Sequence, residues 1–379
     1  MSSNNTIRMC AAGSGKTWSI CNEALANAND AINCKRILIT TYTNKGIDTV
    51  NDELAKQNLG VPSQRITVRT WYQFLLAELI RPYQSHIVGI NQIKAFDFAD
   101  RYGQVNYGKE GEVKRYFSGR QRLVKKDNAS ELAVYLNKQS LGSVISRLEK
   151  VYSHIYIDEI QDMAGHDLSI VEMLFDSRID VICVGDNKQA TYSTHNSRKN
   201  KGKTGRNLWE FCTDKQKDGI ATIEENMVSR RFNSNICAFA NAVYPNTKNI
   251  TTSMTEITGH DGVFIIESND AKSYSEHFNP VVLKYDRRTD VGGVPSYNYG
   301  ECKGMTFNRV LLYPTKPLTN FFAGKALTSQ EKYYVAVSRP RYSLAIVVNN
   351  LPTSTIFESV DIPLVNMTIH ALRFVERGN

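Results

Sequence analysis

Short runs of apolar and β-branched residues recur along the chain, and longer stretches with apolar residues at helical spacing separate them. Apolar runs of this length, bounded by polar segments, are typical of strands buried on both faces of a sheet. Their alternation with helical stretches predicts an α/β protein built on parallel sheets. We expect strands at residues 6–9, 36–40, 65–70, 154–158, 180–186, 263–267, 281–285, 309–313 and 344–348.

The stretch from residue 82 to 150 has a different pattern. It is helical and charged, and its centre is the basic segment KEGEVKRYFSGRQRLVKK, residues 109–126. A chain of 379 residues is long enough for two core-forming domains. We therefore expect a first domain at residues 1–81 and 151–228, a helical basic insertion at 82–150, and a second domain at 229–379.

Composition and charge narrow the class of protein. Apolar residues make up 41% and charged residues 22%, as in ordinary soluble domains. The longest apolar runs, such as LAIVV, are far shorter than the roughly 20 residues that span a bilayer, and no secretion signal precedes them. The seven cysteines lack the spacing of a zinc site or a redox dithiol, so we expect reduced, mostly buried thiols. We expect a cytoplasmic protein without membrane contact. Its net charge of +8 suits a polyanionic partner without establishing one.

The segment CAAGSGKT, residues 10–17, has the pattern of a phosphate-binding loop. It follows an expected strand and precedes an amphipathic helix, which is the context that separates such a loop from an ordinary strand–turn–helix. Glycines let successive N–H groups face a phosphate, and the helix N-terminus adds its dipole. Lys16 is expected at the outer phosphates and Thr17 at Mg²⁺. Cys10 replaces the usual first glycine. The predicted nucleotide-binding residues are Ala12, Gly13, Ser14, Gly15, Lys16 and Thr17.

Two further strand ends carry polar residues suited to nucleotide hydrolysis. HIYIDEIQD supplies Asp158 as a Mg²⁺ ligand and Glu159 as the group that orients and activates the attacking water. VICVGDNKQATY places Gln189 where it can sense the γ-phosphate. Because the carboxyl ends of parallel strands meet at one edge of a sheet, these residues are expected to converge with the loop.

An ordered set of motifs resembles the UvrD/Rep branch of superfamily 1 helicases. The segments are AGSGKT, TTYTNKG, TWYQF, YIDEIQD, VGDNKQATY, SRRFNSNICAFANAV, YGECKGMTFNRVLLYP and YYVAVSRPRYSLAIVV, and they span residues 10 to 348. The resemblance implies two RecA-like P-loop domains with parallel sheets that close on ATP and Mg²⁺, with single-stranded or tailed DNA as the partner. RNA stays an alternative, because little in these motifs reads a 2′-hydroxyl.

The resemblance also implies arginines that act on the γ-phosphate from the second domain. Arg231 matches the arginine of the family's NYRS motif and Arg339 that of its TRA motif, with Arg230 as an alternative to Arg231. Arg230 stands where relatives have the tyrosine that stacks on the base. Thr306 stands where they have a glutamate that contacts the ribose. Arg230 is therefore a nucleotide-binding candidate, and other purine triphosphates are alternatives to ATP.

Aromatic and polar residues within the same motifs are candidates for contacts with DNA. An aromatic ring can stack on a base of any sequence, while core packing is the alternative for each ring taken singly. The residues that the resemblance implies are Tyr42, Thr43, Asn44, Trp71, Tyr72, Tyr192 and Lys303.

The expected architecture is compact. Relatives carry a large 2B domain before the motif that contains KGMTF, whereas here only about ten residues join VVLKYDRR to YGECKGMTF, so we expect a small helical 1B-type insertion and no 2B domain. This compactness and the wording of GECKGMTFNRVLLYP resemble the UvrD-like helicase subunit of Gabija anti-phage systems, which works beside an OLD-family nuclease.

The leading hypothesis is therefore a DNA-stimulated ATPase of superfamily 1A type that acts with a nuclease in anti-phage defence. One alternative is an ATP-hydrolysing sensor or regulatory subunit of a nuclease complex that does not unwind DNA. The others are a DNA repair or recombination helicase and a DNA-binding module with an inactive ATP site. The intact set of Lys16, Asp158, Glu159, Gln189 and Arg339 argues against the last.

Overall fold

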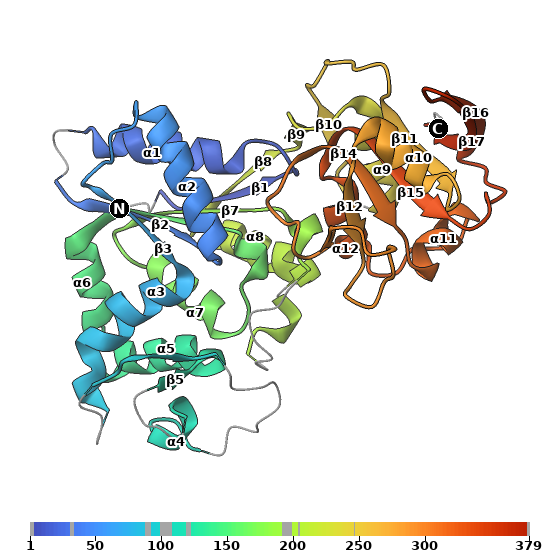
Figure 1. The fold of residues 1–379 in the computed structure, drawn as a ribbon. Coiled ribbons are helices and arrows are strands. Elements are labelled where there is room, and N and C mark those ends of the chain that lie inside the picture. The colour runs from blue at the N-terminus through green and yellow to red at the C-terminus, as the bar shows by residue number, and fades with distance from the viewer. Residues whose placement is uncertain are drawn as a thin grey trace. The chain divides into compact units, whose positions relative to one another are not determined.

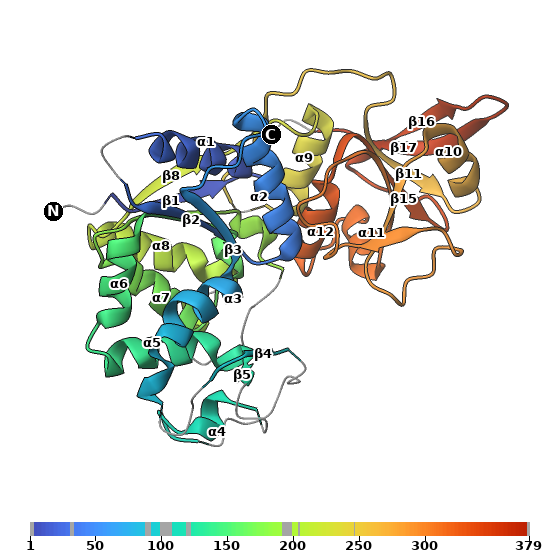
Figure 2. The same ribbon diagram turned by 60° about the vertical axis from the view of Figure 1, so that its left-hand side comes forward.

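The computed structural model describes residues 4–30, 34–87, 92–98, 108–118, 123–191, 199–203, 205–245 and 247–376. The chain forms two compact units (Figures 1 and 2). The first unit comprises Met1–Met9 and Lys16–Glu225, and the second comprises Cys10–Gly15 and Asn226–Asn379. The short loop Cys10–Gly15 thus packs with the second unit, although β1 and α1 on either side of it belong to the first.

The first unit is built on a six-stranded sheet with the order β3-β2-β6-β7-β1-β8. Neighbouring strands from β3 to β1 run parallel. The inner strand β2 is buried on both faces, since Ile37, Leu38 and Ile39 are all 0% exposed, which explains its unbroken apolar run. The strands are β1 (Thr6–Cys10), β2 (Arg36–Thr41), β3 (Ile66–Thr70), β6 (Tyr152–Asp158), β7 (Asp180–Gly185) and β8 (Thr222–Asn226).

Helices cover both faces of this sheet. Figures 1 and 2 show α1 (Lys16–Ala28) and α2 (Asn44–Gln57) on one face, and α7 (His166–Phe175) and α8 (Leu208–Lys217) on the other. The short helix α3 (Trp71–Phe74) begins at a capping box, in which Thr70 and Gln73 satisfy each other's backbone N–H groups. A π-helical turn, Leu75–Ile80, continues it.

The segment from 82 to 150 contains the expected helices and also strands that the sequence did not predict. Its helices are α4 (Val113–Tyr116), α5 (Ala129–Gln139) and α6 (Ser143–Val151). The strands β4 (Ala95–Asp97) and β5 (Leu123–Lys125) pair in parallel. At three residues each, they are too short to show an apolar pattern.

The second unit has a seven-stranded sheet with the order β13-β12-β14-β15-β11-β17-β16. The strands from β13 to β11 run parallel, and the hairpin β16–β17 extends the sheet in the antiparallel sense. Its core includes Ile265, Leu312 and Ile346, each 0% exposed. The strands are β11 (Gly262–Glu267), β12 (Val281–Lys284), β13 (Ser296–Asn298), β14 (Phe307–Tyr313), β15 (Pro340–Val348), β16 (Phe357–Pro363) and β17 (Thr368–Phe374).

The remaining elements of the second unit are short strands and helices. They are β9 (Val228–Ser229), β10 (Thr251–Thr252), α9 (Ser234–Val243), α10 (Ala271–Phe278), α11 (Lys316–Phe322) and α12 (Gln330–Val337). Every strand expected from the sequence is present, so the prediction of an α/β protein with parallel sheets is confirmed.

Six of the cysteines are buried as expected, and Cys34 is exposed. Within the described residues, no helix has the length and apolar character needed to cross a bilayer.

Candidate functional site

The carboxyl ends of three neighbouring strands of the first unit carry the predicted catalytic groups. In the parallel register, Asp158 of β6 is level with Val184 of β7, and Met9 of β1 is level with Gly185 of β7. Since adjacent strands lie about 4.8 Å apart, the ends of β1 and β6 are separated by only about 10 Å. Helix α1 begins at Lys16, shortly after β1 ends, so Lys16 and Asp158 arise at the same edge of one sheet.

The loop from Cys10 to Gly15 is tightly enclosed. Gly13 and Gly15 have φ values of 75° and 87°, in the left-handed region that favours glycine. The carbonyl of Gly13 accepts a hydrogen bond from the N–H of Arg230 at 2.9 Å. A Cβ on Gly13 would lie 2.5 Å from the Cβ of Arg231. Cys10 is 6% exposed, so the residue that replaces the usual first glycine is accommodated in the core.

The start of α1 provides further features of a phosphate site. The first four N–H groups of any α-helix have no partner within the helix, and the helix dipole makes this end positive. Residues Lys16 to Ser19 occupy that turn, with Lys16 and Thr17 half-buried. One turn later, burial raises the pKa of the Cys21 thiol to about 12, with smaller contributions from Glu53 and Asp158, so this thiol is neutral.

Asp158 and Glu159 are held in different ways. Asp158 is 7% exposed, and its Oδ1 accepts the N–H of Glu159 at 2.9 Å. Glu159 has φ 60°, a left-handed conformation that is uncommon for a residue with a side chain. The side-chain amide of Gln161 donates to its carboxylate. A strained backbone at the residue expected to activate water is consistent with a functional role.

Gln161 and Asp186 connect Glu159 to Gln189. The Oε1 of Gln161 accepts the N–H of Asp186 at 3.0 Å, and Asp186 Oδ2 accepts from the Gln189 side chain at 2.6 Å. A Cβ on Gly185 would lie 2.4 Å from Gln161 Oε1, so this approach requires a glycine. Glu159, Gln161, Asp186 and Gln189 therefore form one hydrogen-bonded chain. Neither Gln161 nor Asp186 was predicted as a site residue, although both lie within the motifs YIDEIQD and VGDNKQATY.

Arg339 is fully buried, at 0% exposed. Its guanidinium donates to the carbonyls of Val335 (2.7 Å) and Met305 (3.3 Å) and to the hydroxyl of Ser338 (3.0 Å). Its assignment to the γ-phosphate stays a prediction.

Arg231 is held by the same segment, whereas its neighbour is open to solvent. The Nη1 of Arg231 donates to the carbonyl of Ser338 at 3.1 Å. Arg230 is exposed, and only its backbone N–H has a described contact with the loop. Of the two residues considered for the nucleotide, Arg230 thus has the more accessible side chain.

A buried carboxylate anchors two of the candidate DNA-binding aromatics. Asp167, at the start of α7, is 0% exposed. It accepts from Trp71 Nε1 at 2.7 Å and from the Tyr42 hydroxyl at 2.6 Å, and the hydroxyl of Ser130 in α5 donates to it as well. Trp71 is itself 0% exposed, so its predicted role as a stacking platform is not met in this structure. It is a core residue, fixed by both packing and a hydrogen bond.

The other DNA-binding candidates have different surroundings. Tyr42 is half-buried and Tyr72 is 8% exposed. Thr43 is the exposed N-cap of α2 and accepts the N–H of Gly46 at 3.0 Å, and Asn44 is exposed at the first position of that helix. Lys303 is half-buried in the second unit. Tyr192 lies outside the described residues.

Comparisons with known proteins agree with part of this picture. Residues 90–201 match the family described as UvrD/REP helicase N-terminal domain. The chain is similar to the protein of a structure titled "The structure of PRRSV helicase", with 14% identity and a TM-score of 0.46, over 97% of this chain and 59% of that one. No curated protein sequence matches the chain. Over residues 90–201 the chain is thus similar to the N-terminal domain of the UvrD/REP helicases.

Proposed function

We propose that the chain is a DNA-stimulated ATPase, a superfamily 1 motor that works with a nuclease partner in anti-phage defence. The observation that carries the ATPase part is the hydrogen-bonded chain from Glu159 through Gln161 and Asp186 to Gln189, at the sheet edge where α1 begins. Such a connection lets Glu159, which activates the water, respond to Gln189, which senses the γ-phosphate. The defence role and the nuclease rest on the wording of residues 300–314 and on the compact architecture.

The residues present suit a magnesium nucleotide. Thr17 and Asp158 offer hard oxygen ligands, and Mg²⁺ is usually held by one or two protein oxygens together with substrate phosphates. Among the described residues no group of three or more His, Cys, Asp and Glu could hold a metal, so phosphate oxygens would complete the shell. Bound Mg²⁺ would neutralise charge on the phosphates.

In this proposal each residue of the site has one task. Lys16 and the N–H groups at the start of α1 bind the phosphates, with Gly13 and Gly15 shaping the loop. Glu159 orients the attacking water and accepts its proton, and the Gln161 amide fixes that carboxylate. Arg231 and Arg339 are assigned to the terminal phosphate on the resemblance alone.

Hydrolysis by purified variants tests the catalytic assignment. Lys16→Ala should abolish ATP hydrolysis, while Glu159→Gln should retain ATP binding and lose nearly all turnover, because the amide cannot accept a proton. Lys45→Ala is the matched control, since Lys45 is exposed on α2. If Lys16→Ala and Glu159→Gln both hydrolyse ATP at the wild-type rate, the catalytic assignment is wrong.

Three further measurements test the partners. Hydrolysis should rise with single-stranded DNA, and binding should weaken steeply with salt through counterion release. The isolated chain should unwind a 3′-tailed duplex poorly, because the proposed architecture lacks a 2B domain to grip the duplex. Efficient, processive unwinding by the chain alone would favour an ordinary helicase over a motor that depends on a partner.

A further inference from the structure

Three aromatic rings meet where the insertion lies against the sheet of the first unit. Phe98 follows β4 and contacts Tyr72 of α3, with ring centroids 5.8 Å apart and planes at 84°. Phe96 of β4 contacts both, at 5.5 Å from Tyr72 and 6.0 Å from Phe98. These edge-to-face arrangements are the favoured geometry for aromatic pairs. Phe98 is therefore supported by the edges of its neighbours.

Phe98 is exposed, unlike the rings that support it. Its side chain is 65% exposed, compared with 9% for Phe96 and 8% for Tyr72. A phenylalanine held on one side and open on the other presents apolar surface to water at a fixed orientation. That combination is what a planar ligand requires for stacking.

The cluster continues toward the sheet edge that carries the candidate DNA-binding residues. Tyr72 contacts Tyr42 edge-to-face at 6.2 Å, and Tyr42 directly follows β2. Tyr72 lies in the helix that directly follows β3, which pairs with β2. Phe98 is thus the exposed end of a row of rings that starts at the carboxyl ends of β2 and β3.

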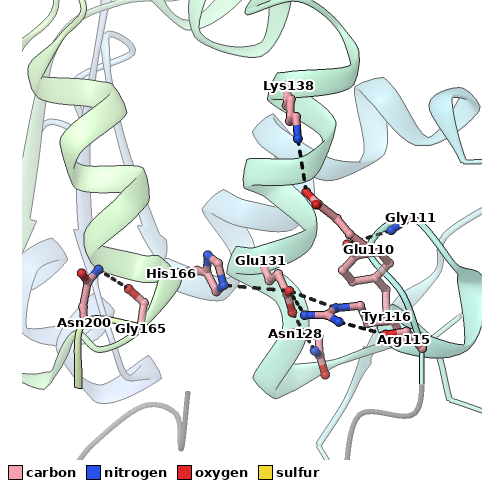
Figure 3. Close-up of polar contacts among 11 residues, drawn as sticks. Glu110, Gly111, Arg115, Tyr116, Asn128, Glu131, Lys138, Gly165, His166 and Asn200 are labelled. Atoms are coloured by element: carbon pink, nitrogen blue, oxygen red, sulfur yellow. Dashed lines mark hydrogen bonds and ion pairs between the residues drawn. The ribbon is translucent and has the colours of Figure 1, made fainter. Parts of the chain in front are cut away.

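A positive charge accompanies the rings. The ammonium group of Lys126 lies 5.6 Å from the centroid of the Tyr72 ring, and Lys125 precedes it in β5. Two glutamates of the insertion are engaged elsewhere, as Figure 3 shows. Glu131 accepts from Arg115 (2.9 Å) and Asn128 (3.1 Å) and lies 3.9 Å from His166, and Glu110 lies 3.8 Å from Lys138. These contacts join α4 and α5 and bring the start of α7 against them.

We propose that Phe98, backed by Tyr72 and Phe96, with the ammonium group of Lys126 over the Tyr72 ring, binds a base of a single-stranded nucleic acid by stacking. The inference rests on the proposed function, because it assumes that a single strand follows the sheet edge at Tyr42. The exposed face of Phe98 takes the base, and the ammonium group of Lys126 attracts the phosphate backbone. Stacking on phenylalanine reads no hydrogen-bonding edge, so the contact is independent of sequence.

Binding of a fluorescent oligothymidylate of about 16 nucleotides, a length within the usual range of single-strand sites, tests the platform on the full chain. Phe98→Ala and Phe98→Leu should each weaken binding by roughly 5- to 150-fold, the loss expected for one stacked base. Phe98→Tyr keeps an aromatic face and should bind as the wild type does. Leu141→Ala is the matched control, because Leu141 is 95% exposed in the same insertion.

The outcomes separate this inference from the proposed function. If the wild type binds the oligonucleotide and the affinity of Phe98→Ala or Phe98→Leu is within twofold of the wild-type affinity, Phe98 is not a stacking platform. The proposed function then stands. If the wild type neither binds the oligonucleotide nor hydrolyses ATP faster in its presence, both are wrong. ATP hydrolysis without DNA should be unchanged in every variant, and a lower rate would show that the substitution damaged the fold.

Discussion

Replacing Asp167 is expected to destabilise the first unit more than almost any other single polar substitution. Asp167 has no exposed surface and accepts hydrogen bonds from Trp71, Tyr42 and Ser130, which come from three separate parts of the chain. These donors follow β2 and β3 or lie in α5. Asp167→Ala would therefore weaken the attachment of the sheet edge and of the insertion at the same time.

The size of the effect follows from the fate of each donor. A buried donor that loses its acceptor costs about 1–3 kcal/mol, and Trp71 Nε1 and Ser130 Oγ are both buried. The hydroxyl of Tyr42 is half-buried and can turn to water, which reduces its share. Two buried donors at that cost, together with the smaller share of Tyr42, lead us to expect that Asp167→Ala costs about 3–5 kcal/mol.

Asp167→Asn should cost less, about 1–2 kcal/mol. Its carbonyl can still accept from Trp71 and Ser130. Only the contact with Tyr42 changes, because the asparagine amide would donate where the carboxylate accepted.

Urea unfolding followed by tryptophan fluorescence measures the free energy of unfolding of the first unit. Trp18, Trp71 and Trp209 all lie in the first unit, so their emission reports on that unit. With a denaturant slope of about 3 kcal/mol per molar, a loss of 3–5 kcal/mol lowers the midpoint by roughly 1–1.7 M. Asp48→Ala, at an exposed position of α2, is the control. If Asp167→Ala shifts the midpoint no more than Asp48→Ala does, the three hydrogen bonds contribute nothing and the reasoning fails.

Two other positions give clear expectations. Gly13→Ala would place a Cβ 2.5 Å from the Cβ of Arg231, whereas Gly142→Ala, also at positive φ, meets no atom within 4 Å. Only Gly13→Ala should therefore lose affinity for a fluorescent ATP analogue, and equal losses would point to backbone strain alone. Burial, with Arg309 as the next cause, lowers the pKa of His260 to about 4, so the unfolded chain takes up this proton at higher pH than the folded one. The second unit should lose stability as the pH falls from about 6.5 to 4. His260→Asn should flatten that dependence in thermal unfolding followed by circular dichroism, and an unchanged slope would exclude His260 as its source.

The sequence predicted the inner parallel strands of the two large sheets well because they are largely buried on both faces. Ile37–Leu38–Ile39 in β2 illustrates such a run, which keeps its apolar character at every position. Strands β16 and β17 mix apolar and charged residues, as in Asp361 beside the buried Ile362, so they lack the unbroken apolar run of a strand buried on both faces. β17 joins the sheet by pairing with β11, a partner about 100 residues away in the chain.

Within the candidate site, motifs identified residues but not their surroundings. The motif that names Glu159 also contains Gln161, yet only the pairing of β6 with β7 brings Gln161 to Asp186. In the same way, the motif made Trp71 a candidate for base stacking with core packing as the alternative, and it is joined by a hydrogen bond to Asp167, which lies 96 residues further along the chain. Contacts between distant segments cannot be read from local spacing.

The left-handed backbone of Glu159 implies a conflict between folding and catalysis at this position. A residue with a side chain pays about 1–2 kcal/mol for that conformation, and glycine does not. Folding alone would therefore favour glycine here, and Glu159→Gly should make the first unit more resistant to urea while removing the carboxylate that activates water. The chain accepts lower stability at this turn to place a carboxylate directly after the metal ligand. Selection for stability alone would thus be expected to eliminate the activity.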